Sequence, residues 1–210
     1  MISKNVLFVG GSSQIAIELA RKIKNIDFFN LSRKRAKFYK RNIILKNYNF
    51  LEIKKKIKNF NKKFDAVFVF NGIYEQSTLS FFDEKIFKKI ININLIVPIK
   101  ISSLILEAQI LKNGSSVNFI TSLAGTKPAI GNAYYAISKN SLIFASKIFA
   151  EEFKKRKIRF NSVSLGLIKS KMSSFLISKL PKTKNKFKSN LVSINKVKKL
   201  ILKIINNKIF

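Results

Sequence analysis

The sequence contains no cysteine and no histidine. Without cysteine, disulfide bonds and thiolate chemistry are excluded. Without histidine, a Ser-His-Asp triad and the usual zinc sites are excluded as well, and we expect no metal site. Proton transfer must therefore depend on tyrosine, lysine, aspartate or glutamate side chains.

Acidic residues are scarce too: 10 Asp and Glu stand against 42 Lys and Arg, a formal charge of +32. Such a charge attracts polyanions such as nucleic acid, anionic lipid or an acidic carrier protein. However, Lys, Asn, Ile and Phe are abundant together along the whole chain, as an AT-rich genome would produce. Because the lysines do not form one stripe and no RNA-recognition motif is visible, we favour this compositional explanation over a nucleic-acid partner.

The 210 residues, 47% of them hydrophobic, are enough for one domain over residues 1–210 with a full core. The N-terminal residues do not follow the pattern of a signal peptide. Asn92, Asn94, Pro98 and Lys100 interrupt the longest apolar run, Ile90–Leu106, so we expect no membrane span. These features favour a cytoplasmic protein.

Short apolar runs alternate with segments of helical periodicity. The predicted buried strands are Asn5–Gly10, Asp27–Leu31, Asn42–Leu45, Asp65–Phe70, Ser116–Thr121 and Ile158–Ser164. The predicted helices are Ser13–Lys24, Phe50–Lys62, Asp83–Leu111, Ala133–Lys155 and Ile194–Asn206. Strict alternation predicts an α/β fold of three layers, a doubly wound parallel sheet of the Rossmann type with six or seven strands. The long irregular segment at about 169–190 is expected to form a lid.

A turn of small residues follows the first predicted strand. Gly10, Gly11, Ser12 and Ser13 precede the helical pattern that includes Gln14 and Ile15. Such a turn brings backbone N–H groups and the positive end of a helix against a phosphate. The alternative is an ordinary tight turn between a strand and a helix.

The second predicted strand ends at Leu31 and is followed by Ser32 and Arg33, with no acidic residue nearby. A carboxylate at this place would bind the ribose of NAD, whereas arginine accommodates the 2′-phosphate of NADP. The sequence therefore favours NADP(H) over NAD(H). The alternative is that Arg33 is one of many surface charges in the basic run 33–41.

The most specific pattern combines Tyr135, Lys139 and Ser122. Tyr135 and Lys139 are four residues apart and share one face of a helix, so the ammonium is expected to lower the pKa of the tyrosine. Such a pair arises easily by chance in a lysine-rich chain. Ser122, thirteen residues before Tyr135 at the end of a predicted strand, makes chance a poorer explanation.

With these motifs, the chain resembles the short-chain dehydrogenase/reductase family, in its single-domain branch, from Asn5 to about Met172. Gly10–Ala16 is similar to the family's cofactor-binding glycine turn, and Phe70-Asn71-Gly72 resembles its Asn-Asn-Ala-Gly element. The resemblance implies further cofactor contacts, namely Asn47 and Tyr48 against the adenine, and Leu165 and Ile168 along the nicotinamide.

The resemblance also implies catalytic roles. Ser122 would hold a substrate carbonyl and Tyr135 would give its oxygen a proton while hydride arrives from the nicotinamide. Lys139 would bind the nicotinamide ribose and lower the pKa of Tyr135, and Asn94 would hold a water that connects the lysine to solvent. The implied activity is that of an NAD(P)-dependent oxidoreductase acting on a carbonyl or alcohol.

Several residues depart from the family pattern. Gln14 and Ala16 replace two glycines, Val69 and Phe70 stand where asparagines are usual, and Leu165 replaces a proline. Only a short segment ending at Phe210 follows the last predicted helix, where the family would have a seventh strand.

Three questions stay open at this point. The resemblance implies a small carbonyl or alcohol as substrate without identifying it, and a 3-oxoacyl group on an acidic acyl carrier protein is a specific alternative because the chain is so basic. A non-catalytic binding protein of the Rossmann type with a basic surface is a second alternative. The apolar faces of the helices near 83–111 and 133–155 favour a homodimer or homotetramer.

Overall fold

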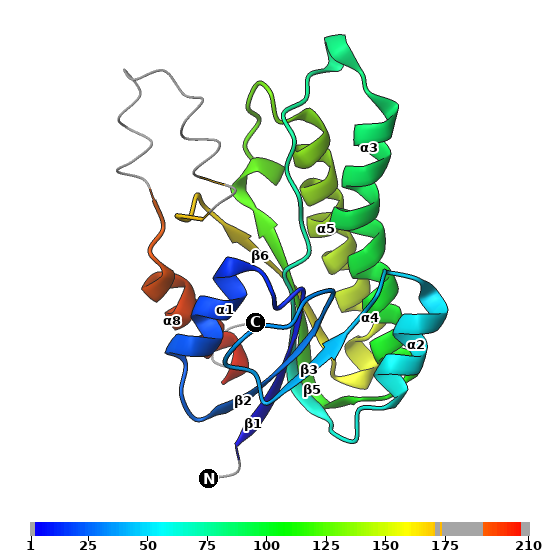
Figure 1. Cartoon of the computed structure of the whole chain (residues 1–210), viewed down its shortest axis with the longest axis vertical. Helices are drawn as coiled ribbons and strands as arrows, with labels where there is room; N and C mark the ends of the chain where they lie inside the picture. The colour runs from blue at the N-terminus through cyan, green and yellow to red at the C-terminus, as the bar shows by residue number, and fades with distance from the viewer. Residues whose placement is uncertain (1–2, 171–172, 174–190, 207–210) are drawn as a thin grey trace.

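The computed structural model describes residues 3–170, 173 and 191–206, and within them a parallel sheet of six strands dominates (Figure 1). The strand order is β3-β2-β1-β4-β5-β6, and every neighbouring pair is parallel. The strands are β1 (Lys4–Val9), β2 (Ile26–Ser32), β3 (Arg41–Ile44), β4 (Phe64–Val69), β5 (Leu111–Ser122) and β6 (Arg159–Leu165). The predicted parallel sheet is confirmed.

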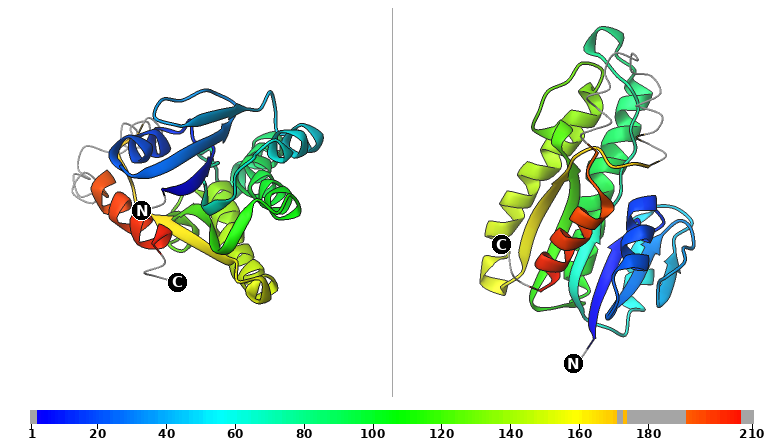
Figure 2. Two further views of the ribbon diagram at one scale, coloured as in Figure 1. Left: turned by 90° about the horizontal axis from the view of Figure 1, so that it is seen from below. Right: turned by 90° about the vertical axis from the view of Figure 1, so that its left-hand side faces the viewer.

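Helices cover both faces of the sheet, which gives the predicted three layers (Figure 2). One face carries α1 (Gln14–Lys22) and α8 (Ile194–Ile205), and the other carries α2 (Phe50–Lys58), α3 (Glu84–Ile91), α4 (Val97–Glu107) and α5 (Ala133–Glu152). Most of the expected lid at 169–190 and the residues after 206 lie outside the described part of the chain.

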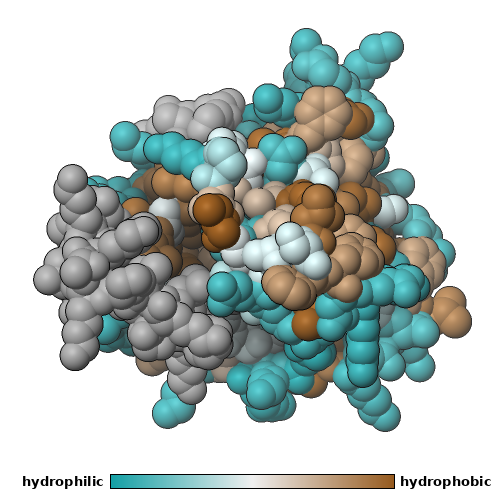
Figure 3. All heavy atoms as spheres, turned by 90° about the horizontal axis from the view of Figure 1, so that it is seen from above, coloured by the Kyte–Doolittle hydropathy of each residue, from teal (hydrophilic) through white to brown (hydrophobic). Residues whose placement is uncertain are grey.

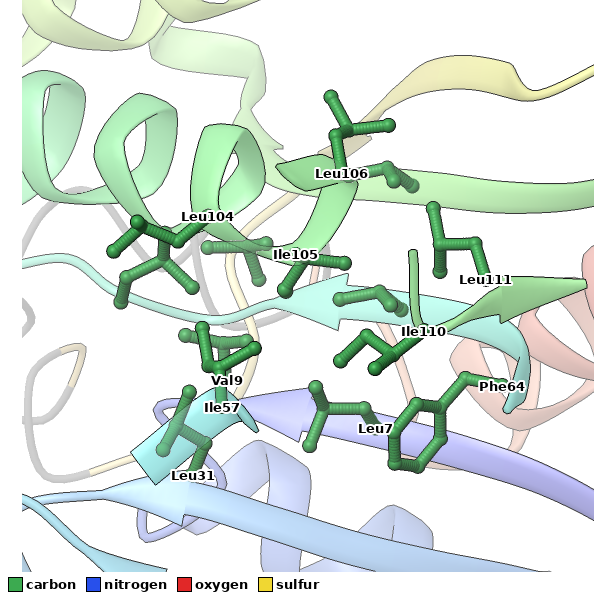
Figure 4. Packing of buried hydrophobic residues seen from close by; sticks show 14 of the residues in the cluster. Leu7, Val9, Leu31, Ile57, Phe64, Leu104, Ile105, Leu106, Ile110 and Leu111 are labelled. Atoms are coloured by element: carbon green, nitrogen blue, oxygen red, sulfur yellow. The ribbon is translucent and has the colours of Figure 1, made fainter. Parts of the chain in front are cut away.

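The core consists of two apolar layers because successive strand side chains point to opposite faces. Leu7 and Val9 of β1 pack with Ile105 and neighbouring residues of α4 (Figure 4). Val6 and Phe8 belong to the second layer, which includes residues of α1 and α8. Each layer buries one face of the sheet and so holds the strand ends in a fixed frame.

The helix predicted for Asp83–Leu111 is divided in the structure. A wider π-helical turn, Asn92–Ile96, separates α3 from α4, and the helix ends at Glu107. Pro98 has no N–H to donate to the carbonyl of Asn94, which favours a local change of helical pitch. Strand β5 then starts at Leu111, five residues before its predicted start.

The helical run Glu84–Glu107 is long and apolar enough, by length and composition, to cross a membrane. The polar residues Asn92, Asn94 and Lys100 lie within this run, and the expectation that it does not span a membrane stays a prediction. Buried core helices meet the same criterion. In this fold, Ile101, Leu104 and Ile105 of the run lie in the core against the sheet.

The strand order reverses between β1 and β4. From β1 the chain adds β2 and β3 on one side, and it then returns to add β4, β5 and β6 on the other side. In open parallel sheets of this kind, ligands bind in the crevice beyond the carboxyl ends of the strands at such a reversal. Gly10 follows β1 and Asn71 follows β4, so both residues border this crevice. The candidate site is therefore built at this end of the sheet.

Candidate active site

The turn after β1 has the geometry of a ligand-binding glycine turn. Gly10 has a φ of +72°, which favours glycine, and a Cβ built there would lie 3.1 Å from the backbone nitrogen of Asn71. Ser13 caps α1, its Oγ accepting a hydrogen bond from the Ala16 N–H at 3.3 Å. The N-terminus of α1 thus lies beside the crevice, where it can bind a phosphate.

Tyr39, which no sequence motif marks, supports this turn from the side. Its hydroxyl donates a 2.7 Å hydrogen bond to the carbonyl of Gly11. Burial raises the pKa of Tyr39, so its hydroxyl keeps the proton that it donates. The contact joins residues 28 positions apart, which is why local sequence patterns could not predict it.

Three predicted cofactor residues form a chain of contacts on the other side of the turn. The guanidinium carbon of Arg33 lies 5.4 Å from the ring centroid of Tyr48, and the Asn71 amide donates to the Tyr48 hydroxyl at 2.9 Å. Ser32 is buried and donates to the carbonyl of Lys34, and Asn47 is exposed and accepts from the Asn49 N–H. The structure therefore brings Arg33, Tyr48 and Asn71 together, but not the Ser32 and Asn47 side chains.

Ser122 and Tyr135 meet at the end of β5. Ser122 is the last residue of β5, and Tyr135 lies in the first turn of α5. Burial raises the pKa of the Tyr135 hydroxyl, while a hydrogen bond with Ser122 acts in the opposite direction. The Tyr74 ring packs edge-on against the Tyr135 ring, with centroids 5.4 Å apart. The sequence analysis did not predict this contact.

The expectation that Lys139 lowers the pKa of Tyr135 is corrected by this geometry. The net direction for Tyr135 is upward, because burial is the largest influence. The Lys139 ammonium lies 5.8 Å from the centroid of the Tyr135 ring. Burial of the lysine also lowers its own pKa to about 8, which reduces its positive charge in mildly alkaline solution.

Lys139 is held at the crevice by backbone carbonyls. Its side chain is 3% exposed, and its Nζ donates to the carbonyls of Ile120 at 3.1 Å and Asn71 at 3.3 Å. A Cβ at Gly72 would lie 3.1 Å from this Nζ, so glycine leaves room for the ammonium. The lysine therefore sits where β4 and β5 end.

Asn94 lies in the π-helical turn and is completely buried. Its Oδ1 accepts from the Ile73 N–H at 2.8 Å, and its Nδ2 donates to the Ile73 carbonyl and to Ser138 Oγ, both at 3.0 Å. Ser138 in turn donates to the carbonyl of Tyr135 at 2.7 Å. Asn94 thus ties the loop after Gly72 to α5, and its predicted role toward a water stays a prediction.

These residues fit a dinucleotide at the reversal of the strand order. The glycine turn and the α1 N-terminus suit a pyrophosphate, Tyr48 offers a ring to a base, and Lys139 offers a buried ammonium. Asn71 Oδ1 is buried with no hydrogen-bond partner among the described residues, as expected of a group that faces a ligand. Leu165 and Ile168 belong to the apolar layer with α1 and α8, so their side chains lie in the core.

The end of the molecule seen in Figure 3 shows apolar side chains beside hydrophilic ones. Ser77 and Asn132 pair and bring together two segments, a short 3-10 helix with the residue after it and a loop. Four of the large apolar residues that these segments expose are Leu79, Phe81, Phe82 and Ile130. The structure therefore exposes an apolar surface on these two neighbouring segments.

Comparison with known proteins gives a consistent result. Residues 4–180 match the family model described as short chain dehydrogenase. Carbonyl reductase family member 4 of Xenopus laevis is 34% identical over 122 residues, 58% of this chain and 52% of that protein. A 3-oxoacyl-[acyl-carrier-protein] reductase of Thermotoga maritima is 32% identical over 113 residues, 53% of this chain and 46% of that protein. The matched stretches thus span about half the length of these relatives.

A solved structure agrees on the fold. Actinorhodin polyketide ketoreductase with NADPH superposes with a TM-score of 0.82 at 15% identity, covering 97% of this chain and 90% of that one. At this identity the likeness is one of fold, and it extends over nearly the whole chain.

Proposed function

Because this chain belongs to the short-chain dehydrogenase family of oxidoreductases, which bind a nicotinamide cofactor, we propose that it is an NADP(H)-dependent carbonyl reductase or alcohol dehydrogenase. The observation that carries the proposal is the convergence of Ser122, Tyr135 and buried Lys139 at the carboxyl ends of β4 and β5. Proton transfer by a tyrosine requires neither histidine nor cysteine, and the chain contains neither of them.

The bound nicotinamide supplies or accepts the hydride. In reduction, Ser122 Oγ holds the carbonyl oxygen, and Tyr135 gives that oxygen the proton of its hydroxyl. The raised pKa of Tyr135 keeps the hydroxyl protonated and ready to donate. Lys139 binds the nicotinamide ribose and Asn94 fixes the loop beside it. The activity is tested with a panel of ketones and aldehydes, and the loss of NADPH absorbance measures the rate with each one. If no member of the panel is reduced, the proposed activity is contradicted.

Arg33 supports the choice of NADP(H), because its stacking on Tyr48 holds a guanidinium beside the adenosine end of the crevice. We expect Arg33→Ala to weaken NADPH binding about tenfold and NADH binding less than twofold, since only NADPH carries the 2′-phosphate. Isothermal titration calorimetry measures both constants.

Arg35→Ala is the matched control, since Arg35 is an exposed residue of the same basic segment, whereas the guanidinium that lies over the Tyr48 ring is that of Arg33. We expect it to leave both affinities nearly unchanged. Equal losses for NADPH in the two variants would show that only general charge attraction is at work, and the preference for NADP(H) would then fail.

A carrier-bound 3-oxoacyl group is a second candidate substrate. The formal charge of +32 suits an acidic carrier, and the Thermotoga maritima relative is named for this reaction. Reduction of free ketones without reduction of the carrier-bound substrate would eliminate this candidate.

We also propose that the protein is a homodimer or homotetramer, since α5 exposes Ile137, Phe144 and Ile148, with Phe144 61% exposed. We expect Phe144→Lys to dissociate the assembly, because burying an unpaired charge at an interface is costly. Leu51→Lys on α2, where Leu51 is 73% exposed, is the control. Sedimentation equilibrium distinguishes the outcomes, and an unchanged mass for Phe144→Lys would place the interface elsewhere.

A further inference from the structure

Two asparagines face each other across β2 and β3. Asn30 of β2 stands opposite Asn42 of β3 in the strand register, and its Nδ2 donates to Asn42 Oδ1 at 2.8 Å. Asn30 is completely buried, on the same face of β2 as Phe28, which belongs to the apolar layer with α1 and α8. A buried amide in such a layer costs free energy unless it is hydrogen-bonded. The identity of its partners therefore indicates what the pair does.

The partners are backbone groups of the basic loop between β2 and β3. Asn42 accepts from the Ala36 N–H at 3.0 Å and donates to the Ala36 carbonyl at 3.2 Å, so it binds both backbone groups of one residue. Asn30 donates to the carbonyl of Lys34 at 3.3 Å, and Ser32 donates to the same carbonyl at 2.7 Å. The asparagine pair thus fixes the backbone of the loop at two places.

The same loop is tied to the glycine turn after β1. The Tyr39 hydroxyl donates to the Gly11 carbonyl at 2.7 Å, and a Cβ built on Gly11 would lie 2.5 Å from Asn30 Oδ1. Phe38 has a φ of +70°, which is unfavourable for an aromatic residue and persists only where the surrounding structure enforces it. The asparagine pair and Tyr39 together therefore hold one defined loop conformation against the glycine turn.

This conformation affects the charge at the adenosine end of the crevice. Arg33 directly precedes Lys34, whose carbonyl the pair binds, and its guanidinium carbon lies 5.4 Å from the centroid of the Tyr48 ring. The Arg33 side chain is exposed, so its position depends on how well the backbone beside it is fixed. An arginine that is already held in place loses less conformational freedom when it binds an anion, and it therefore binds the anion more tightly.

We propose that the Asn30–Asn42 pair positions Arg33 for the 2′-phosphate of NADP(H) and so sets the preference for this cofactor. This inference rests on the proposed function, because it assumes a nicotinamide dinucleotide in the crevice. Both asparagines act through the loop backbone and are positioning residues, with no contact to the cofactor required. A pair that only stabilised the fold would affect NADPH and NADH equally, whereas a pair that acts through Arg33 affects NADPH alone.

The test measures NADPH and NADH binding by the full chain with isothermal titration calorimetry. We expect Asn42→Ala to weaken NADPH binding about fivefold and NADH binding less than twofold, because the loss of both bonds to Ala36 loosens the loop beside Arg33. In a chain that already carries Arg33→Ala, Asn42→Ala should weaken NADPH binding no further, since the residue through which Asn42 acts is gone.

Asn161→Ala is the matched control, because it breaks a second pair of the same kind. Asn161 of β6 stands opposite Asn118 of β5, and its Nδ2 donates to Asn118 Oδ1 at 2.8 Å. Strands β6 and β3 form opposite edges of the sheet, so this second pair is remote from the basic loop. We expect Asn161→Ala to lower the midpoint of thermal unfolding, as Asn42→Ala does, and to leave the ratio of the two dissociation constants unchanged.

Three results would overturn the inference: a folded Asn42→Ala that keeps the wild-type ratio, losses that multiply in the double variant, or an equal shift of the ratio in Asn161→Ala. If Asn42→Ala does not fold, Asn42→Ser takes its place, because the shorter serine side chain cannot reach both backbone groups of Ala36. A failure of the proposed function looks different. A wild type that does not bind NADPH overturns that function, and Arg33→Ala with unchanged NADPH affinity overturns the preference for NADP(H).

Discussion

Replacing Tyr135 with phenylalanine is expected to lower kcat at least about a thousandfold while leaving the calorimetric Kd for NADPH within about threefold. General acid–base groups contribute on the order of 10² to 10⁴ in rate, and the chain has no histidine or cysteine to substitute for the tyrosine. The ring stays in place against Tyr74, so the change removes the hydroxyl and little packing. Rates are measured by NADPH consumption with the best substrate of the panel.

Tyr134→Phe is the matched control because it removes a hydroxyl from the neighbouring residue of the same helix. The Tyr134 hydroxyl accepts from the Asp83 N–H at 2.7 Å, away from Ser122 and Lys139. Its loss should reduce stability by about 1 kcal/mol and leave kcat nearly unchanged. Equal kcat values for Tyr135→Phe and the wild type would remove Tyr135 from the proton-transfer step.

Replacing Lys139 with methionine is expected to lower kcat about a thousandfold and, unlike Tyr135→Phe, to weaken NADPH binding. The ammonium is held by two backbone carbonyls at the crevice and is the group assigned to the nicotinamide ribose. Methionine fills similar volume without a charge or a donor. Calorimetry and steady-state kinetics on the same preparation separate the two effects, and full activity would exclude the assigned role.

The same variant tests the pKa of Lys139 through the pH dependence of stability. Burial lowers this pKa to about 8 in the folded protein, from an unfolded value of 10.5. Between these two values the unfolded chain binds more protons than the folded chain, so the lysine makes stability rise with pH. From pH 8 to pH 10 the wild type should gain about 2 kcal/mol of unfolding free energy relative to Lys139→Met. Parallel urea titrations measure this difference, and equal slopes with pH would contradict the low pKa.

Much of the fold was predictable because the apolar residues of the sequence follow two clear patterns, one typical of buried strands and one typical of helices. Apolar strand runs alternate with helical patterns, and all six predicted strands are present in order. The helix boundary at Glu107 was not predictable, since Ala108 to Ile110 continue an apolar helical pattern. There the tertiary pairing of β5 with β4 overrides local propensity, and Gln109 takes a positive φ of 52° to leave the helix.

The candidate site was predictable where its residues lie close in sequence. Tyr135 and Lys139 share a helix face, and Ser122 ends the preceding strand. The contact of Asn71 with Tyr48 spans 23 residues and depends on how two loops meet, so no local pattern indicates it. Burial depth was likewise not readable from the sequence, which is why the pKa of Tyr135 was expected to fall and instead rises.

The central claim is that the chain transfers hydride between a nicotinamide and a carbonyl carbon, with Tyr135 giving the proton. The most direct measurement offers the protein NADPH that carries deuterium at the reactive C4 position, together with the carbonyl panel, and analyses the products by mass spectrometry. We predict an alcohol with one deuterium on the former carbonyl carbon from the wild type, and at least about a thousandfold less of it from Tyr135→Phe in the same time. A wild type that binds NADPH yet transfers deuterium to no carbonyl would contradict the claim and favour a non-catalytic binding protein.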